Sequence, residues 1–384
     1  MTISRLGVVG AGTMGAGIAQ LGCLGGFEVT LHDPDPQALA SGADRLRAAL
    51  AKGAGKGLWA PEEAAQAEGR LHTGGFEALE ECEVVIEAAP EDLDLKRKLF
   101  AQLEDTCGPE AVLATNTSSI PVTAIAAETT NPNRVCGMHF FNPPPLMRLV
   151  EIIAGESTDE TTLKVATEVA HAMDREPVRA ADAPGFIVNR CNRPFALEAL
   201  RMLGEGVATH AEIDEVMRSG GGYRMGPFEL MDLIGVDVNL KVAQSFYAQR
   251  EIPRWEPHQI QKEMVAAGKL GRKTGQGFYE YEGSRKVEET GAGRGEDARR
   301  AIMERIVSCL VNEASFAVEE GVAEPDDVDT AMKLGLNHPR GPFEWQDELG
   351  AGRIVATLDT LAESAESERE AERYSVADSL RERV

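Results

Sequence analysis

The sequence has no apolar run of about 18 residues or more, so we expect no segment that crosses a membrane. Its first residues, MTISRLGVVG, lead directly into an apolar strand, without the basic region or the small-residue cleavage site of a signal peptide. The cysteines are scattered, with neither a Cys-x-x-Cys pair nor a metal-ligand spacing. We therefore expect a cytoplasmic protein with reduced thiols and no bound metal. The cysteines are Cys23, Cys82, Cys107, Cys136, Cys191 and Cys309.

Basic residues are scarce relative to acidic ones. The formal net charge of the 384-residue chain is −24, which argues against a nucleic-acid partner, because a polyanion needs a basic surface. An anionic small ligand would need a local cluster of positive charge. A chain of this length can form two or three domains, each with its own core.

The first half of the chain alternates short apolar runs, which predict strands, with helix-like stretches. This alternation is typical of a doubly wound α/β domain with a parallel sheet. A connector rich in Pro, Ala and Asp, at 177–185, then leads into a helical region. The expected strands are Leu6–Val9, Glu28–Leu31, Val84–Ala88, Ala111–Thr115, Arg134–Met138 and 149–153.

The helical region contains an internal repeat at an offset of 115 residues, in which 198–235 matches 312–350. Glu-Gly-Val-Ala begins at 205 and again at 320, and Gly-Pro-Phe-Glu begins at 226 and again at 341. The match predicts two copies of one helical unit, separated by a Gly-rich, charged linker at 283–297. The charged end of the chain, from residue 364, is interpreted as a helix or tail with a solvated face.

A glycine motif follows the first expected strand, in LGVVGAGTMGAGIAQ. Gly10 permits a tight turn, Gly12 lets the backbone approach a pyrophosphate, and Gly15 lets the following helix pack on the strand. The pyrophosphate would then lie at the N-terminus of that helix. Asp33, at the end of the second strand, can accept hydrogen bonds from a ribose 2′-OH and would repel a 2′-phosphate. The motif therefore predicts NAD rather than NADP.

These features together predict a domain order. We expect an NAD-binding Rossmann-type domain at 1–182 and a first helical domain, for substrate and assembly, at 183–282. The linker at 283–297 precedes a second helical repeat with its charged tail at 298–384.

An acid, Glu151, lies inside the apolar run Leu149–Ile153, where a buried strand is expected. Burying a lone carboxylate is costly unless it is paired and hydrogen-bonded. The nearest candidate partner is His139, which ends another apolar stretch. Because imidazole titrates near neutral pH, a carboxylate on one ring nitrogen would leave the other able to accept and return a proton.

Six ordered motifs resemble the 3-hydroxyacyl-CoA dehydrogenases. The likeness runs from residue 3 to about residue 282 and resumes in the second helical copy, as in the fused branch of that family. The resemblance implies NAD-linked, reversible oxidation of an (S)-3-hydroxyacyl-CoA to the 3-ketoacyl-CoA. The motifs are GVVGAGTMGAGIAQ, ATNTSS, GMHFFNPPPLMRLVEII, APGFIVNR, YRMGPFELMDLIG and GRKTGQGFYEY.

The resemblance implies roles for individual residues. His139 matches the general base, with Glu151 as the residue that orients it. Ser118 matches a serine that hydrogen-bonds the substrate oxygen, and Asn189 an asparagine near the reacting carbonyl. Without the resemblance, His139 would be interpreted as a core histidine and Ser118 as part of a helix cap. Since the second copy has Glu304 in place of Asn189 and lacks a nucleotide domain, we expect one active site per chain.

Further contacts to NAD are implied in the same way. Glu91, Lys96, Asn142 and Lys273 match positions on the nicotinamide or ribose side; surface charge is the alternative interpretation. The whole implied set is Gly10, Gly12, Thr13, Met14, Gly15, Asp33, Glu91, Lys96, Asn116, Asn142 and Lys273.

The stretch RLRAALAKGAGK supplies a positive cluster for the phosphates of coenzyme A, with Arg45, Arg47, Lys52 and Lys56. Lys56 matches a CoA-contacting lysine of the family, while Ala49 stands where some members have a serine. An amphipathic helix with a basic solvated face is the alternative.

For assembly, we expect the second helical copy to fold onto the first as an internal pseudo-dimer in a monomeric chain, with a true homodimer as the alternative. The expected partner is an acyl-CoA thioester. Two other functions stay open: a sugar-acid oxidoreductase of the L-gulonate 3-dehydrogenase type, and a catalytically silent NAD-binding or structural protein. Acyl-chain length, and whether the acyl group is dicarboxylic, are not determined by the sequence.

Overall fold

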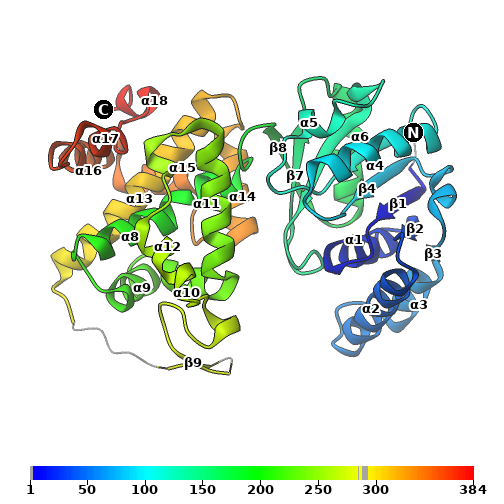
Figure 1. Cartoon of the computed structure of the whole chain (residues 1–384), viewed down its shortest axis with the longest axis horizontal. Helices are drawn as coiled ribbons and strands as arrows, with labels where there is room; N and C mark the ends of the chain where they lie inside the picture. Colours follow the sequence, from blue (N-terminus) through cyan, green and yellow to red (C-terminus); the bar gives the residue numbers. More distant parts are fainter. Residues whose placement is uncertain (1–2, 284, 288–292) are drawn as a thin grey trace. The chain divides into compact units, whose positions relative to one another are not determined.

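The computed structural model describes residues 3–283, 285–287 and 293–384. The chain forms two compact units, Met1–Phe186 and Ile187–Val384 (Figure 1). The first is an α/β unit and the second is mainly helical, which confirms the predicted fold class. No helix among the described residues is long and apolar enough to cross a membrane. All six cysteines lie in the described part of the chain, where they are buried and free of disulfides.

The first unit is built on an eight-stranded sheet with the order β3-β2-β1-β4-β5-β6-β7-β8. Neighbouring strands pair in parallel, except for β6 and β7, which are antiparallel. The central strands are continuous apolar runs, as expected for strands covered by helices on both faces. The strands are β1 Arg5–Val9, β2 Glu28–His32, β3 Leu71–Thr73, β4 Val84–Glu87, β5 Val112–Thr115, β6 Val135–Phe140, β7 Leu149–Ala154 and β8 Glu176–Ala181.

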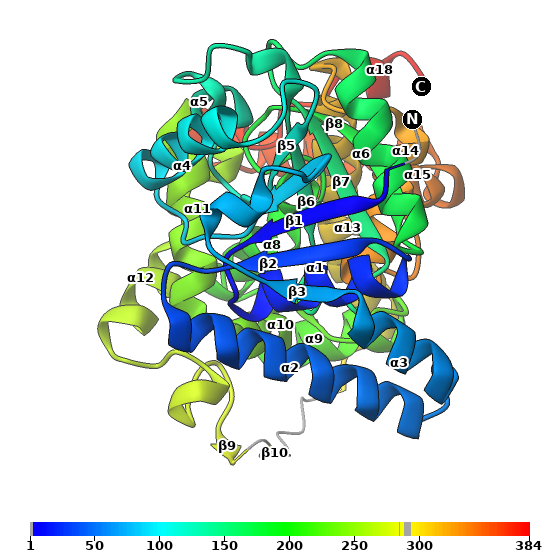
Figure 2. The ribbon, with the colours of Figure 1, turned by 90° about the vertical axis from the view of Figure 1, so that its right-hand side faces the viewer.

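Helices cover this sheet, and one set of them shares an apolar core with it, formed by α1, α2, α3 and α6. Figure 2 shows β1, β2 and β3 side by side, with α2 next to β3. The glycine motif connects β1 to α1 at the carboxyl end of β1, the edge at which parallel sheets bind ligands. The helices are α1 Thr13–Leu24, α2 Pro36–Gly55, α3 Pro61–Gly69, η1 Phe76–Leu79, α4 Leu93–Thr106, α5 Val122–Ala126, η2 Pro132–Arg134 and α6 Glu160–Ala172.

The six expected strands are all present, to within about two residues at each end. The prediction of a connector at 177–185 is wrong in its first part, because β8 continues to Ala181. Within the described part of the chain, β8 pairs with β7 alone, so it lies at the edge of the sheet, where a proline can be tolerated in a strand. Pro177 therefore did not prevent strand formation. The short strand β3 was not predicted either.

The second unit consists of the two helical copies. In the first copy the elements are α7 Val188–Cys191, α8 Arg193–Gly204, α9 His210–Ser219, α10 Pro227–Ile234, α11 Val236–Arg250, η3 Pro253–Trp255, α12 Gln259–Ala266, η4 Arg272–Thr274, and the hairpin strands β9 Tyr281–Glu282 and β10 Arg285–Lys286. In the second they are α13 Glu296–Glu319, α14 Pro325–Leu336, α15 Pro342–Leu349, α16 Ala351–Glu363, α17 Glu368–Glu372 and α18 Asp378–Arg381. Long helix α13 packs against α8, so both copies share one core.

The repeated motifs have the same geometry in both copies. The carboxylate of Asp214 accepts the backbone N–H groups of Phe228 and Glu229, both at 2.9 Å. Asp329, 115 residues later, accepts those of Phe343 and Glu344 at 2.8 and 3.1 Å. Glycine is required where each helix begins, since a Cβ at Gly226 or Gly341 would lie 2.2–2.3 Å from an atom of the capping aspartate. The repeat in sequence is thus a repeat of buried helix caps.

The linker prediction at 283–297 is partly corrected. Arg285 and Lys286 pair with Tyr281 and Glu282 in the hairpin, and α13 already begins at Glu296. Residue 284 and residues 288–292 lie outside the described residues.

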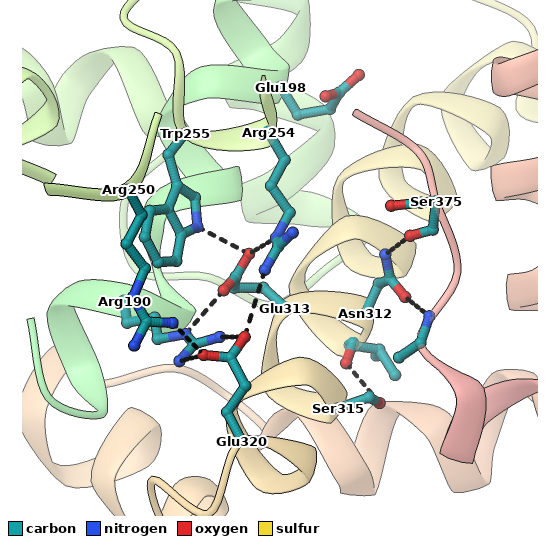
Figure 3. A network of polar contacts seen from close by, with 12 residues as sticks. Arg190, Glu198, Arg250, Arg254, Trp255, Asn312, Glu313, Ser315, Glu320 and Ser375 are labelled. Atoms are coloured by element: carbon teal, nitrogen blue, oxygen red, sulfur yellow. Dashed lines mark hydrogen bonds and ion pairs between the residues drawn. The ribbon is translucent and has the colours of Figure 1, made fainter. Parts of the chain in front are cut away.

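The end of the chain is not a freely solvated tail. Tyr374, Ala377 and Leu380 are buried. The side chain of Asn312 on α13 donates to the carbonyl of Ser375 at 2.8 Å and accepts the N–H of Ala377 at 2.9 Å (Figure 3). These three buried residues are spaced three apart among many charged ones. The composition of the segment therefore led to the wrong prediction of a solvated tail.

Candidate functional site

The turn between β1 and α1 leaves backbone N–H groups available. Gly10 has a φ of +99°, and a Cβ there would lie 2.6 Å from the carbonyl oxygen of Ala88. A Cβ at Gly15 would lie 1.7 Å from the carbonyl oxygen of Gly10. Gly12, the N-cap of α1, has no side-chain cap, and a Cβ at this residue would have open space for 4 Å around it. The first turn of α1, which contains Thr13 and Met14, therefore offers an open N-terminus that fits a pyrophosphate.

Asp33 closes this turn from the end of β2. Its Oδ2 accepts the N–H of Ala11 at 2.8 Å, and its Oδ1 accepts the N–H of Asp35 at 3.0 Å. These bonds hold a negative charge beside the glycine loop. Such a charge suits a free ribose 2′-OH and opposes a 2′-phosphate, so the residues present fit NAD.

His139 and Glu151 form a buried pair on neighbouring strands. They lie directly opposite each other in the antiparallel β6–β7 register, which brings their side chains to the same face. Nδ1 of His139 is 2.6 Å from Oε2 of Glu151. The exposed fractions are 6% for His139 and 0% for Glu151. With the carboxylate as acceptor, Nδ1 carries the proton and Nε2 is the nitrogen that can accept one.

Other contacts fix the strand and the ring of His139. Oδ1 of Asn116, in the loop after β5, accepts the N–H of Phe140 at 2.8 Å. The aromatic rings of Phe141 and Phe186 lie 4.6 and 5.8 Å from the imidazole, between ring centroids. The imidazole is therefore held by one charged contact and two apolar rings.

Glu91 organises the loop that carries Ser118. Its Oε1 accepts the hydroxyl of Thr117 at 2.7 Å and the backbone N–H groups of Ser118 and Ser119, both at 3.0 Å. Burial alone would raise the pKa of Glu91, but the Thr117 hydroxyl, the charge of Lys96 and the Ser119 hydroxyl lower it below its usual value. An ionised Glu91 thus holds the loop in place, while Ser118 stays exposed.

Lys96 is not a surface charge, contrary to the alternative interpretation above, because its exposed fraction is 1%. Its ammonium lies 2.6 Å from Oε1 of Glu87 and 3.6 Å from Oε2 of Glu91. The second oxygen of Glu87 accepts the hydroxyl of Thr115 at 2.7 Å. Sequence reasoning missed Glu87, although an acid that ends the apolar strand Val84–Glu87 is the same signal that singled out Glu151.

The remaining implied residues lie in separate places. Asn142 is exposed in the loop after β6. Asn189 and Lys273 belong to the second unit. There the carbonyl oxygen of Asn189 accepts a hydrogen bond from Nε of Arg193 at 3.1 Å, and Lys273 is bound to both carboxylate oxygens of Asp237 at 2.6 and 2.7 Å.

The basic cluster forms a stripe on α2. Arg45, Ala49, Lys52 and Lys56 are spaced so that they share one side of the helix, and the three charged members are exposed. Nη1 of Arg45 donates to the carbonyl of Ala11 at 3.4 Å, so the stripe begins beside the glycine loop.

Arg47 does not belong to this stripe. It lies on another side of α2 and pairs with Asp44 at 3.1 Å and with Glu68 at 3.6 Å.

Comparison with known proteins gives consistent matches over the whole chain. Residues 5–183 match the model of the 3-hydroxyacyl-CoA dehydrogenase NAD-binding domain, and residues 185–281 and 302–383 match that of the 3-hydroxyacyl-CoA dehydrogenase C-terminal domain. A 3-hydroxyadipyl-CoA dehydrogenase from Escherichia coli is 36% identical, with 100% of this chain and 98% of the relative covered. A 3-hydroxybutyryl-CoA dehydrogenase from Clostridioides difficile is 40% identical, with 72% of this chain and 99% of the relative covered. Among solved structures, a 3-hydroxybutyryl-CoA dehydrogenase from Escherichia coli superposes with a TM-score of 0.92 at 34% identity, covering 100% of this chain and 98% of that one.

Proposed function

Because the chain belongs to the 3-hydroxyacyl-CoA dehydrogenase family, whose members are NAD-dependent oxidoreductases, we propose that it oxidises an (S)-3-hydroxyacyl-CoA reversibly to the 3-ketoacyl-CoA, with His139 as general base. The observation that carries the residue assignment is the buried contact of 2.6 Å between His139 and Glu151. A histidine whose Nδ1–H is bound to a carboxylate keeps one tautomer, and its Nε2 is the atom that exchanges a proton with the substrate.

Nε2 of His139 takes the proton of the C3 hydroxyl as the hydrogen on C3 leaves as hydride. NAD, when bound, supplies the hydride acceptor. Glu151 stabilises the imidazolium that forms and keeps Nδ1 protonated throughout. Because the pair is almost fully buried, the Coulomb interaction between imidazolium and carboxylate is stronger than it would be in water. In the reverse direction, the same imidazolium returns its proton to the substrate oxygen.

Ser118 and Asn189 position the oxygen on C3. Ser118 lies in a loop whose backbone N–H groups are bound by Glu91 at 3.0 Å, whereas the Ser118 hydroxyl makes a longer contact of 3.5 Å with the same carboxylate oxygen. The side-chain amide of Asn189 offers a donor that matches the carbonyl oxygen of the ketone.

The proposed dinucleotide site uses the open end of α1 for the pyrophosphate and Asp33 for the ribose. Glu91 and Lys96 act through the charge network that holds the 117–119 loop. The proposed NAD-binding residues, with these two acting through that network, are Gly10, Gly12, Thr13, Met14, Gly15, Asp33, Glu91, Lys96, Asn116, Asn142 and Lys273.

The stripe of Arg45, Lys52 and Lys56 is proposed to bind the phosphates of coenzyme A. It supplies a local positive potential in a chain with a net charge of −24. A free sugar acid would not need this stripe, which favours a thioester substrate over the L-gulonate alternative.

For assembly, the proposal is that the two helical copies cover each other within one chain, so that a monomer suffices; a homodimer is the alternative. A light-scattering mass of one chain, 41.3 kDa, is expected, and a mass of twice that would overturn this part. The proposed location is the cytoplasm, which suits six buried cysteines that form no disulfide in the described part of the chain.

The test is a substrate panel followed by NADH oxidation. The panel contains acetoacetyl-CoA, a longer 3-ketoacyl-CoA and a dicarboxylic 3-ketoacyl-CoA, each with NADH and with NADPH. Turnover with NADH and at least one thioester, and far less with NADPH, is the expected result. The preferred thioester then assigns the acyl chain.

Absence of turnover with any thioester would contradict the proposed function. In that case L-gulonate and 3-ketogulonate serve as the next substrates. NADH binding without turnover of either class would support the catalytically silent alternative.

A further inference from the structure

Asn189 lies on a helix too short to hold its own position. α7 spans only Val188–Cys191, and a single turn is not stable without tertiary contacts. Arg190, which follows Asn189, is the residue of α7 with the most extensive charged contacts, and its side chain is fully buried. The partners of Arg190 therefore hold α7 in position.

Two carboxylates of the second helical copy hold it (Figure 3). Nε of Arg190 donates to Oε1 of Glu313 at 2.9 Å. Nη1 and Nη2 donate to the two oxygens of Glu320 at 3.1 and 2.8 Å. Both acids lie on or just after α13, 123 and 130 residues along the chain from Arg190. We call this set, Arg190 with Glu313 and Glu320, the first clamp.

The acids of the first clamp are themselves held in place. Oε2 of Glu313 accepts Nε of Arg254 at 2.6 Å and the indole N–H of Trp255 at 3.0 Å. Oε2 of Glu320 also accepts Nη1 of Arg250 at 2.6 Å. A buried guanidinium bound on three nitrogens to fixed carboxylates has very little freedom to move.

A second clamp repeats this pattern 115 residues later with the copies exchanged. Arg305 corresponds to Arg190, and Glu198 and Glu205 correspond to Glu313 and Glu320. Nε of Arg305 donates to Glu198 at 2.6 Å, and its two Nη atoms donate to Glu205 at 2.7 and 2.9 Å. Such reciprocal contacts are typical of a two-fold interface.

The two clamps differ in what stands beside the arginine. Asn189 precedes Arg190, whereas Glu304 precedes Arg305. Glu304 is engaged by Arg353, whose Nη2 lies 2.7 Å from Oε1. One clamp thus adjoins a side chain of the proposed active site, and its counterpart adjoins a structural ion pair.

We propose that Glu313 and Glu320 of the second helical copy are positioning residues for Asn189, acting through Arg190. The second copy then completes the active site without contributing a group that touches substrate. This inference rests on the proposed role of Asn189. A contact that only stabilised the fold would act equally from both clamps.

The mirrored clamp provides the matched control. Glu320→Gln and Glu205→Gln make the same chemical change at corresponding, partly exposed acids. We expect Glu320→Gln to lower kcat for the preferred thioester about tenfold with KM for NADH unchanged, and Glu205→Gln to leave kcat within about twofold. The thermal midpoints should fall by similar amounts.

Two further measurements separate positioning from general stability. In an Asn189→Ala background, Glu320→Gln should cause no additional loss of kcat, because its effect passes through Asn189. Amide hydrogen exchange in residues 188–191 should rise in Glu320→Gln and not in Glu205→Gln. If Glu320→Gln does not fold, Glu320→Asp keeps the charge but shortens the side chain, which lengthens the contact with Arg190, and the same differences are expected.

Equal loss of kcat in the two clamp variants would overturn the inference, as would full additivity with Asn189→Ala. Exchange in residues 188–191 that does not distinguish the two variants would overturn it too. A wild-type chain that turns over no thioester, with the exchange difference between the variants still present, would leave the clamp in place and remove the proposed function instead. The two failures are therefore distinguishable.

Discussion

The two helical copies share most of their packing contacts but differ in the chemistry of one pair of corresponding side chains. Asp214 and Asp329 cap corresponding helices, and Arg190 and Arg305 enter corresponding clamps. By contrast, Asn189 corresponds to Glu304, which is bound in an ion pair. The shared features are those that fold the unit, and the unshared position is one that the proposed reaction needs.

A second contrast concerns the hydrogen-bond partners of the two capping aspartates. Asp214 is buried and also accepts the hydroxyl of Tyr279 at 2.8 Å, while Asp329 accepts only the two backbone N–H groups among the contacts of the described residues. Copies of one unit can thus keep the same cap and still depend on it to different extents. Substitutions at corresponding positions of the two copies test that dependence.

Asn189→Ala should lower kcat about 10²-fold, because it removes a donor to the oxygen on which charge changes during the reaction. Glu304→Ala, the same truncation at the corresponding position, should leave kcat within about threefold. Steady-state kinetics with the preferred thioester and NADH measure both. A similar loss in the two variants would show that the copies do not differ in function at this position.

Asp214→Ala should destabilise the second unit by about 3 kcal/mol, since it strands two backbone N–H groups and a buried hydroxyl. Asp329→Ala should cost about 1–2 kcal/mol, because only the two N–H groups are lost and water reaches them more easily. Chemical denaturation of both variants gives the comparison. A greater loss for Asp329→Ala would reverse the assigned order.

His338 and Tyr223 correspond at the offset of 115 and lie with ring centroids 4.9 Å apart. Burial lowers the pKa of His338 from 6.5 to about 3, so the folded chain keeps this ring neutral while the unfolded chain protonates it. The stability that depends on a neutral His338 is therefore fully present above about pH 6.5 and is lost as the pH falls towards about 3. At about pH 5 the free energy of unfolding should be lower by about 2 kcal/mol.

His338→Gln removes this titration, and its unfolding free energy should fall less between about pH 7 and about pH 5 than that of the wild type. Tyr223→Phe serves as the control, because tyrosine does not titrate in that range. A variant that loses as much stability as the wild type on acidification would contradict the account.

Most of the fold could be predicted because its signals are local. Apolar runs marked the six central strands, and the Gly-Pro-Phe-Glu repeat marked the two caps. The edge strand β8 was missed because its alternating residues and Pro177 resemble a connector. The docked end of the chain was missed because Tyr374, Ala377 and Leu380 are outnumbered by charges.

Part of the site could be predicted because a buried charge is unstable without a partner. This requirement led from Glu151 in its apolar strand to His139, and the same requirement at the end of β4 leads from Glu87 to Lys96. The clamps could not be predicted, because reciprocal contacts between residues 100 or more positions apart leave no trace in a single sequence beyond the repeat itself.

The general-base role of His139 is tested by the kcat of His139→Gln with the preferred thioester, measured beside the dissociation constant of NADH. We expect kcat to fall about 10²–10⁴-fold while NADH binding changes by less than about threefold, because glutamine can still bond to Glu151 but cannot take the proton. A variant that keeps kcat within about threefold of the wild type would contradict it.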